Sequence, residues 1–405
     1  MDPFVIMENL DRVKPAFQPI ISAVSHSIIG YEVLGRFREN EEWTSLGHFF
    51  HDPDVPDEYK AEVDDHLLHL AVAEMLETNN SGLLFVNRTA QQLSINNGED
   101  FLQSLIRFER EGFSMDRIVL EITEHDFEED FDVLNHLLIY YKTYGIQVAV
   151  DNVGAKSSNI DRIRQLRPHI LKIDTTLVRN LNPDVFEDIL LTLSVLARRI
   201  GAKFAYENIE SHHQLQSAWK HGGYYYQGYY LAKPDFDLLT TDSLPIQIDE
   251  EINLFVQREK KLVEQRLAFA EGCEDKIKEL LPLWPGSDKA DSFLKEVSRA
   301  FNEESFRIYM CNSDGEQISS NIRKFEETWN LESGIKGSHW AFRPYFIENT
   351  MQMKKWKKGT LSDLYSDIST SEMIRTFSYP LSEDCFLFID ISFSFIYNHD
   401  HLLLQ

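Results

Sequence analysis

Short runs rich in β-branched and aromatic residues alternate with longer helix-favouring stretches from about residue 15 to residue 235. Helical stretches such as 65–77 and 131–145 separate the runs, and the second of them ends at Gly145, a typical helix stop. This alternation predicts a parallel α/β fold, and the length of the region favours a closed (β/α) barrel over an open sheet. The predicted strands are FQPIISAV (17–24), LLFVN (83–87), RIVLEIT (117–123), IQVAVD (146–151), HILKID (169–174), KFAYE (203–207) and YYYQGYY (224–230).

The strand–helix alternation ends after Pro234, and the residue composition of the chain changes. Residues 248–281 are charged and helix-favouring with one apolar stripe, and PLWPGSD (282–288) then breaks the helix. Beyond it, SFRIYMCNSDGEQISS predicts a hairpin that turns at Asp314-Gly315, and MIRTFSYPL and CFLFIDISFSF are further strand-like runs. We therefore expect a barrel over 1–245, a linker helix over 246–286 and a second, α+β domain over 287–405.

Bulk composition excludes several classes of protein. A formal charge of −26 argues against binding to long nucleic acids, whose affinity comes mainly from Lys and Arg on phosphates. The apolar runs are far shorter than the ~20 residues of a membrane span, and the acidic start lacks the pattern of a signal peptide, so we expect a cytoplasmic protein without membrane insertion. Cys273, Cys311 and Cys385 lie far apart, which favours buried free thiols over disulfides or a zinc site.

Polar residues interrupt the predicted barrel strands near their ends. In a (β/α) barrel the strand ends meet at one face, which carries the active site. Four carboxylates and an amide oxygen converging there would repel one another, and divalent cations such as magnesium, manganese or calcium relieve that repulsion. One such residue alone is more often a cap or an ion-pair partner, but the series, which also has Lys172 at a strand end, predicts a metal site with the oxygen ligands Glu32, Asn87, Glu121, Asp151 and Glu207.

The motifs of residues 15–240 resemble those of EAL domains, which bind and hydrolyse cyclic di-GMP. Glu32-Val33-Leu34 stands where that family has Glu-Ala-Leu, and Arg36 follows at the family's spacing. The resemblance implies a modified TIM (β/α)8 barrel with one strand reversed. The other matching segments, in order, are FQPI (17–20), VN (86–87), LEITE (120–124), VDN (150–152), LKID (171–174), YENIE (206–210) and QGYYLAKP (227–234).

Roles carried over from the resemblance give a two-metal phosphodiesterase site that uses Mg²⁺ or Mn²⁺, with Ca²⁺ as an inhibitory substitute, and forms linear pGpG. Glu32, Asn87, Glu121 and Asp151 would hold the first metal, and Asp151 would bridge to a second metal that Glu207 also holds. Lys172 would contact the attacking water between the metals or the phosphoryl oxygen, and Glu124 would brace the loop after Asp151. The implied nucleotide contacts are Gln18, Leu34, Arg36, Asp64, Asn152 and Gln227, with Arg36 on a phosphate and Asp64 on Arg36 or a guanine edge.

The chain departs from the family at Asn152, where active members have a second metal-binding aspartate. The loop beyond is altered too, with Lys156 in place of a flexible glycine. Both changes disfavour the second metal and predict weak or absent hydrolysis with nucleotide binding retained. Two alternatives stay open. The presence of Glu207 and Lys172 favours an active phosphodiesterase, and a scaffold that has lost the nucleotide is disfavoured by Glu32, Arg36 and Asn87.

The C-terminal region resembles PAS-like or Cache-like sensory domains, and the whole layout resembles the YkuI type of EAL protein, which implies a homodimer. Such domains often bind small ligands, although a purely structural dimerisation domain is an equal alternative. The candidate pocket residues are Arg343, Tyr345, Tyr365, Asp367 and Arg375.

Overall fold

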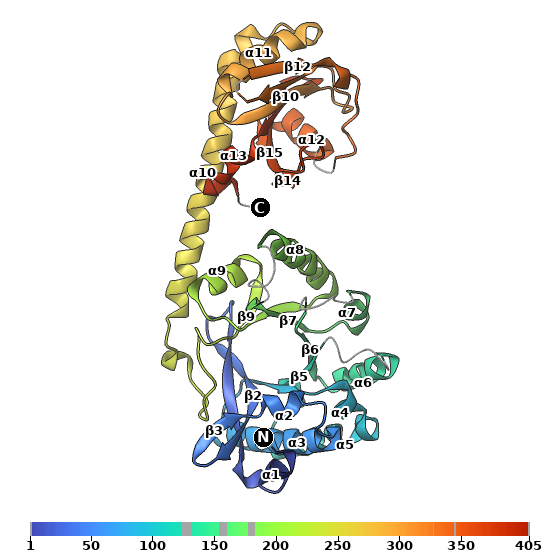
Figure 1. Cartoon of the computed structure of the whole chain (residues 1–405), viewed down its shortest axis with the longest axis vertical. Helices are drawn as coiled ribbons and strands as arrows, with labels where there is room; N and C mark the ends of the chain where they lie inside the picture. The colour runs from blue at the N-terminus through green and yellow to red at the C-terminus, as the bar shows by residue number, and fades with distance from the viewer. Residues whose placement is uncertain are drawn as a thin grey trace. The chain divides into compact units, whose positions relative to one another are not determined.

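The computed structural model describes residues 2–123, 131–153, 160–176, 183–326, 328–343 and 346–403. These residues form two compact units, residues 1–253 and 254–405 (Figure 1). No helix in the described part of the chain is long and apolar enough to cross a membrane. The three cysteines are buried free thiols, which confirms that prediction.

Eight strands within the described residues of the first unit close into a barrel, because β1 pairs with both β2 and β9. Of these strands, β1 alone runs antiparallel to its neighbours, which confirms the barrel with one reversed strand. A ninth strand, β3 (Glu42–Ser45), extends β2 outside the barrel. The barrel strands are β1 (Val13–Ser22), β2 (Ile28–Glu39), β4 (Leu83–Asn87), β5 (Ile118–Thr123), β6 (Gln147–Asp151), β7 (Ile170–Asp174), β8 (Lys203–Glu207) and β9 (Gly223–Tyr226).

Of the long strand β2, the sequence located only the stretch IIGY (28–31) that precedes Glu32. Glycines and charged residues, among them Gly30, Glu32 and Arg36, interrupt its apolar pattern, so no β-type run stands out. Its position depends on non-local pairing, since β2 pairs with β1 from Ile28 to Phe37 and with β4 from Gly30 to Glu32. A Cβ at Gly30 would lie 2.4 Å from the carbonyl oxygen of Leu83, so only glycine permits this close approach of β2 to β4.

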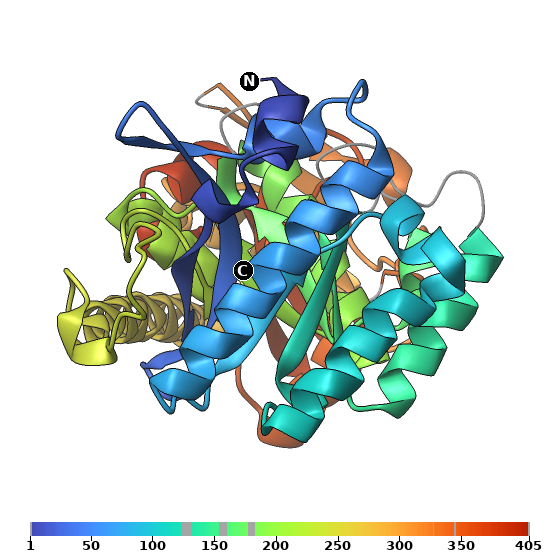
Figure 2. The ribbon, with the colours of Figure 1, turned by 90° about the horizontal axis from the view of Figure 1, so that it is seen from below.

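Helices surround the barrel, and α3 packs across β1 and β2 (Figure 2). In α5, Phe101, Leu105 and Phe108 recur at helical spacing and are buried. The stop predicted at Gly145 is confirmed, because α6 ends at Thr143 and Gly145 has φ of +88°. The described helices of this unit are α1 (Pro3–Met7), α2 (Gly47–His51), α3 (Asp57–Glu77), α4 (Ala90–Ser94), α5 (Glu99–Glu111), α6 (Phe131–Thr143), α7 (Ile160–Leu166), α8 (Pro183–Ile200) and α9 (His212–Lys220).

The second unit is built on an antiparallel sheet in the order β12-β11-β10-β16-β15-β13, with β14 paired to β15. Helix α11 (Ala290–Ala300) and the C-terminal half of α10 (Ile248–Leu280) bury apolar residues such as Cys273, Ile277 and Phe293 in its core. This arrangement confirms the α+β class. The strands are β10 (Ser305–Cys311), β11 (Asn321–Phe325), β12 (Thr328–Glu332), β13 (Thr360–Leu361), β14 (Tyr365–Ser366), β15 (Met373–Ser382) and β16 (Cys385–Ile391), and the remaining helices are α12 (Phe346–Trp356) and α13 (Phe393–Tyr397).

The hairpin predicted at Asp314-Gly315 is correct at its turn and wrong in its second strand. Gly315 has φ of +86°, and Cys311 bridges to Gln317 immediately after the turn. The regular strand β11 begins only at Asn321, because Glu316 and Gln317 bond instead to the segment around Ser338 and His339.

Candidate functional site

The interior of the barrel is built in layers, and the upper layer carries the candidate site. Seven strands each contribute one residue to a buried apolar cluster, made of Ile20, Phe85, Val119, Ala149, Ile170, Ala205 and Tyr225. Side chains two positions apart on a strand share a face, so the next inward residue on each strand lies one layer higher. On the parallel strands the residue in this upper layer is polar in every case. On β2 it is Glu32, two positions after Gly30. The full set is Glu32, Asn87, Glu121, Asp151, Lys172, Glu207 and Gln227.

Strand reversal explains the position of the remaining member, Gln18. Because β1 runs the opposite way, its upper-layer residue precedes Ile20 in the sequence instead of following it. Gln18 stands opposite Glu32 in the β1–β2 register, and Gln227 donates from Nε2 to Gln18 Oε1 at 3.3 Å and to Glu32 Oε2 at 2.7 Å. Gln18 and Gln227 are buried beside Glu32.

Lys172 lies at the centre of this layer. Its Nζ is 2.8 Å from Glu121 Oε2, 3.1 Å from Glu32 Oε2, 3.2 Å from Glu207 Oε2 and 3.9 Å from Asp151 Oδ1. Lys172 and Glu121 are each only 1% exposed. The strand-end residues predicted from the sequence are therefore brought together, around an ammonium group that the sequence did not place at their centre.

Four carboxylates around one ammonium leave three negative charges in a buried space. Burial opposes the charge on Lys172, but Glu121, Glu207 and Glu32 raise the pKa of its ammonium well above the ordinary value. Burial also opposes the charge on Glu32, yet Lys172 and hydrogen bonds from Gln227 and Asn87 outweigh it and lower the pKa of Glu32.

The negative charge that Lys172 does not balance has its effect on the pKa values of Glu121 and Glu207. Burial and the neighbouring charge of Glu32 raise the pKa of Glu121 well above its usual value despite Lys172. Burial likewise raises the pKa of Glu207 to about 8, with Asp151 and Glu32 adding to the effect of burial. The single positive charge of Lys172 is thus too small to balance these four carboxylates, and a further cation would reduce their mutual repulsion.

The donor chemistry fits a divalent metal ion. Glu121 Oε1, Asp151 Oδ1 and Gln227 Oε1 are buried and accept no hydrogen bond from any described residue, and hard oxygen atoms are the ligands that magnesium, manganese and calcium prefer. Within the described ranges, no three acidic, histidine or cysteine side chains converge on one open point, because the carboxylates surround Lys172 Nζ instead. Binding of a metal ion would therefore require these carboxylates to turn away from Lys172.

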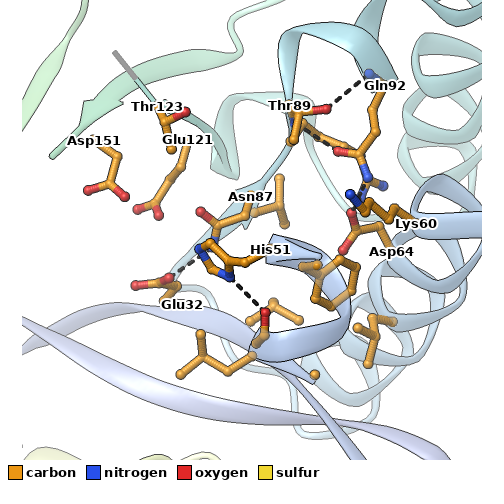
Figure 3. Close-up of a pocket in the computed structure, with 18 of the residues that line it drawn as sticks. Glu32, His51, Lys60, Asp64, Asn87, Thr89, Gln92, Glu121, Thr123 and Asp151 are labelled. Carbon is orange, nitrogen blue, oxygen red and sulfur yellow. Dashed lines mark hydrogen bonds and ion pairs between the residues drawn. The ribbon is translucent and has the colours of Figure 1, made fainter. Parts of the chain in front are cut away.

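A cavity of about 450 Å³ opens above this layer. Figure 3 shows the side chains of Glu32, Asn87, Glu121 and Asp151 at one end of it and Asp64 and Gln92 at the other. Asn87 donates from Nδ2 to Glu32 Oε1 at 2.9 Å. Of the predicted nucleotide contacts, Leu34, Arg36, Asp64 and Asn152 line this cavity, whereas Gln18 and Gln227 lie in the barrel layer beneath it, held by Glu32.

Asn152 sits at the edge of the cavity in a left-handed backbone conformation, with φ of +57°. Asparagine and aspartate adopt this conformation more readily than other residues with a side chain. The Asn152 amide donates from Nδ2 to Asp151 Oδ2 at 2.9 Å, so it occupies one oxygen of the neighbouring carboxylate. The residue beside Asp151 thus acts as a hydrogen-bond donor where an aspartate could only accept.

Of the two partners predicted for Asp64, Arg36 is wrong, and a guanine edge stays a prediction. Asp64 pairs with Arg88, whose Nη1 lies 3.1 Å from Asp64 Oδ2, and accepts from Gln92 Nε2 at 2.8 Å, while Arg36 donates to the Gly35 carbonyl. Burial raises the pKa of Asp64 to about 6 despite Arg88. Arg88 is 6% exposed, and it was not among the predicted site residues. It directly follows β4 but pairs with Asp64 on α3, and no local sequence pattern indicates a pair between such distant positions. Glu124 and the loop containing Lys156 lie outside the described residues.

Comparisons with known proteins identify the family. The EAL domain family matches residues 6–234, more than half of the chain. The chain belongs to the EAL-domain family. Residues 238–403 match a second family, described as an EAL-domain associated signalling protein domain and named YkuI_C. The chain is thus an EAL-domain signalling protein, and the resemblance stated from its motifs is confirmed.

Similar proteins include one that spans the whole chain. The uncharacterized EAL-domain containing protein YkuI of Bacillus subtilis is 42% identical over 406 residues, covering 100% of both chains. A crystal structure of that protein in complex with its substrate cyclic di-GMP and calcium superposes with a TM-score of 0.91, covering 99% of this chain and 100% of that one. The cyclic di-GMP phosphodiesterase PA2567 of Pseudomonas aeruginosa is 27% identical over 54% of this chain and only 38% of its own.

Proposed function

We propose that this protein binds cyclic di-GMP with a divalent cation at the open end of its barrel and hydrolyses it weakly or not at all. The observation that carries the proposal is the set of buried acceptor oxygens of Glu121 and Asp151, beside Glu32 and Asn87, in a cavity that Arg36 also lines. The YkuI relative, 42% identical over the whole chain, has been crystallised with cyclic di-GMP and calcium. A cavity of about 450 Å³ also lies within the range of about 300–1,000 Å³ that small-molecule sites occupy.

The residues divide into a cation group and a nucleotide group. Glu32, Asn87, Glu121 and Asp151 would hold a first Mg²⁺ or Mn²⁺, and Asp151 with Glu207 would hold a second. Bound there, the cations would neutralise phosphate charge and supply an activated water. Arg36 would bind a phosphate of the nucleotide through its planar guanidinium.

Lys172 has a double role in this proposal. Its ammonium balances part of the carboxylate charge in the structure described here, at 2.8 Å from Glu121 and 3.2 Å from Glu207. When those carboxylates turn to a cation, the same ammonium is available to stabilise negative charge that develops on a phosphoryl oxygen. Weak hydrolysis follows from Asn152, which offers a neutral amide where a second metal needs a carboxylate, and whose donor already occupies Asp151 Oδ2.

A second candidate function is a competent cyclic di-GMP phosphodiesterase. One observation favours it, namely that Glu207 and Lys172 lie within 3.2 Å of each other in the barrel layer, although nucleotide binding alone needs neither. The homodimer and the cytoplasmic location expected from the resemblance stay predictions.

The test mixes the purified full chain with cyclic di-GMP and magnesium, manganese or calcium, then separates free, bound and cleaved nucleotide by chromatography. We expect intact nucleotide to stay with the protein, and we expect Glu32→Gln to lose it while Glu109→Gln, an exposed change on α5, retains it. Rapid formation of pGpG would instead support the phosphodiesterase. Nucleotide that is neither bound nor cut would refute both functions and leave the scaffold.

A further inference from the structure

The second unit contains a cavity of its own, with a volume of about 120 Å³. One water occupies roughly 10–15 Å³ by a comparable measure, so the cavity has room for on the order of ten non-hydrogen atoms and is too small for a nucleotide. Its wall includes Arg343 and Asp367 of the predicted pocket residues, together with Arg307, Asn321, Trp340 and Ile335. Tyr365 contacts Arg343, and Tyr345 lies outside the described residues.

Arg375 was wrongly predicted to line a ligand pocket. It is 1% exposed, and it donates from Nε to the Leu402 carbonyl and from Nη1 to the Ser362 carbonyl, both at 2.6 Å. Strand β15 is buried on both faces along most of its length, so sequence alternation gave no indication of which side chains face the cavity. Arg375 therefore ties the C-terminal segment to the sheet.

The wall of the cavity contains more basic than acidic side chains. It includes Arg307, Arg323 and Arg343 against two acids, Glu332 and Asp367. Asp367 is already engaged, because Arg307 donates to both of its oxygens at 2.6 and 3.3 Å. Burial opposes the charge on Asp367, but the hydrogen bonds from Arg307 and Ser369 outweigh it and hold the pKa of that carboxyl below its usual range.

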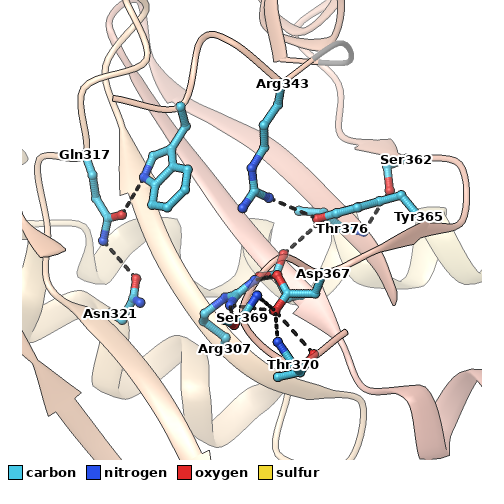
Figure 4. A network of polar contacts seen from close by, with 12 residues as sticks. Arg307, Gln317, Asn321, Arg343, Ser362, Tyr365, Asp367, Ser369, Thr370 and Thr376 are labelled. Atoms are coloured by element: carbon cyan, nitrogen blue, oxygen red, sulfur yellow. Dashed lines mark hydrogen bonds and ion pairs between the residues drawn. The ribbon is translucent and has the colours of Figure 1, made fainter. Parts of the chain in front are cut away.

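Arg343 is the side chain best placed to recognise an anion. It is only 8% exposed, and its guanidinium lies 4.7 Å from the ring centre of Trp340 and 6.0 Å from that of Tyr365. These aromatic contacts hold the planar group in place, and a planar guanidinium matches the two oxygens of a carboxylate. Figure 4 shows Arg343 reaching toward Tyr365, whose hydroxyl oxygen lies 3.4 Å from Arg343 Nη1.

Asn321 supplies a second donor. Gln317 Oε1 accepts from Trp340 Nε1 at 2.8 Å, which fixes the Gln317 amide so that its Nε2 donates to Asn321 Oδ1, also at 2.8 Å. The Asn321 amide is thereby oriented with Nδ2 as a donor, and no acceptor for this nitrogen occurs among the described residues. A ligand that reaches this side of the cavity should therefore present an acceptor.

We propose that this cavity binds a short-chain monocarboxylate, with its carboxylate on Arg343 and Asn321 and its apolar part against Trp340, Ile335 and Ile368. A second carboxylate or a phosphate dianion would meet Glu332 and Asp367, and Arg307 is already engaged by Asp367 and by Asp390. A cation would meet three arginines. The size of the cavity and the balance of its charges thus favour a single negative charge on a small apolar molecule.

Binding at Arg343 would reach the centre of the sheet through a continuous chain of contacts. Arg343 Nη1 lies 3.4 Å from Tyr365 Oη, whose hydroxyl is 2.6 Å from Thr376 Oγ1, and Thr376 donates to Asp390 Oδ1 at 2.6 Å. Asp390 accepts from Arg307 Nε at 2.6 Å, so the chain crosses β14, β15, β16 and β10. Ligand binding is therefore expected to stabilise this unit as a whole.

The experiment uses the full chain and observes the ligand directly, by saturation-transfer NMR on sodium propionate. Propionamide is a control of nearly the same shape without charge, and inorganic phosphate and sodium chloride are added as competitors of the propionate signal at matched ionic strength. We expect propionate to give a saturation-transfer signal, propionamide to give none, and neither phosphate nor chloride to displace propionate. Arg343→Lys, which keeps the charge but loses the planar fork, should weaken binding by about 10–100-fold, whereas Arg299→Lys on the exposed face of α11 should change nothing.

Ile335→Trp provides a test that does not depend on the buried arginine. Ile335 is half-buried at the cavity wall, and a larger ring there should fill the cavity and abolish binding while the protein stays folded. Equal binding of propionate and propionamide, displacement of propionate by phosphate, or propionate binding retained in Ile335→Trp would each overturn the proposal. If Arg343→Lys fails to fold, as judged by circular dichroism, Ile335→Trp and the propionate–propionamide comparison decide.

Discussion

Replacing Asn152 with aspartate tests the interpretation of the barrel site most directly. The substitution preserves the shape of the side chain, and aspartate tolerates the left-handed backbone, φ +57°, nearly as well as asparagine. It removes the hydrogen bond of 2.9 Å to Asp151 Oδ2 and puts two carboxylates side by side. Two unit charges about 4 Å apart repel by about 4 kcal/mol at an effective dielectric constant of 20, an upper bound for the loss of stability without metal.

With metal present the same change should be favourable. Loss of a partner around a metal site typically costs about 10–100-fold in metal affinity or activity, so regaining a ligand should raise hydrolysis by about that factor. In free energy, the gain corresponds to about 1.4–2.7 kcal/mol. The assay compares initial rates of pGpG formation across a magnesium titration, and thermal unfolding in EDTA and in magnesium.

Asn79→Asp is a matched control, because Asn79 has φ of +52° and is exposed at the end of α3, away from the cavity. It should change neither the rate nor the dependence of stability on metal. If Asn152→Asp hydrolyses no faster than the natural chain at saturating magnesium, although its stability responds to the metal, then Asn152 does not limit the chemistry. The altered loop beyond Val153 would then become the leading explanation.

Three further changes have expected outcomes. Lys172→Met leaves four buried carboxylates without their ammonium and should destabilise the protein by about 3–5 kcal/mol in EDTA, and added calcium should restore part of the loss in urea unfolding. Magnesium or calcium at 100 times its dissociation constant should stabilise the natural chain by about 2.7 kcal/mol, and Glu32→Gln should lose most of that effect in thermal scans. Asp367→Asn should destabilise the second unit by about 3–5 kcal/mol at pH 7. Because the pKa of Asp367 is held low by Arg307 and Ser369 against burial, its contribution is present above its unfolded value of about 3.9. The contribution is lost as the pH falls through the lower folded value, so urea curves of the two proteins should converge below about pH 4.

Most of the barrel could be predicted from the sequence, because the alternation of apolar and polar residues within each strand shows which side chains face the interior. In LLFVN and IQVAVD a buried apolar residue is followed two positions later by a polar one, so the face and the height of Asn87 and Asp151 follow from strand alternation alone. The convergence of these side chains required only that the strands be parallel. Their roles as metal ligands stay predictions.

Features that depend on contacts between distant positions could not be predicted in this way. The place of Lys172 at the centre depends on how barrel closure brings β2, β5 and β8 around β7. Arg88 follows Asn87 directly, yet its partners Asp64 and Asp65 lie on α3, more than 20 residues earlier. Arg375 lies on β15 and Arg343 in a turn, so no strand pattern in the sequence indicated that Arg343 lines the second cavity and that Arg375 does not.

The two units satisfy their buried charges differently, and the difference bears on what each can bind. In the second unit all four oxygens of Asp367 and Asp390 accept hydrogen bonds, from Arg307, Ser369, Thr370 and Thr376. In the barrel, by contrast, one oxygen each of Glu121 and Asp151 accepts none from the described residues. A fully bonded network gains little from an added cation, whereas buried acceptors without donors are stabilised by one. Chelation should therefore lower the stability of the barrel and leave the stability of the second unit unchanged.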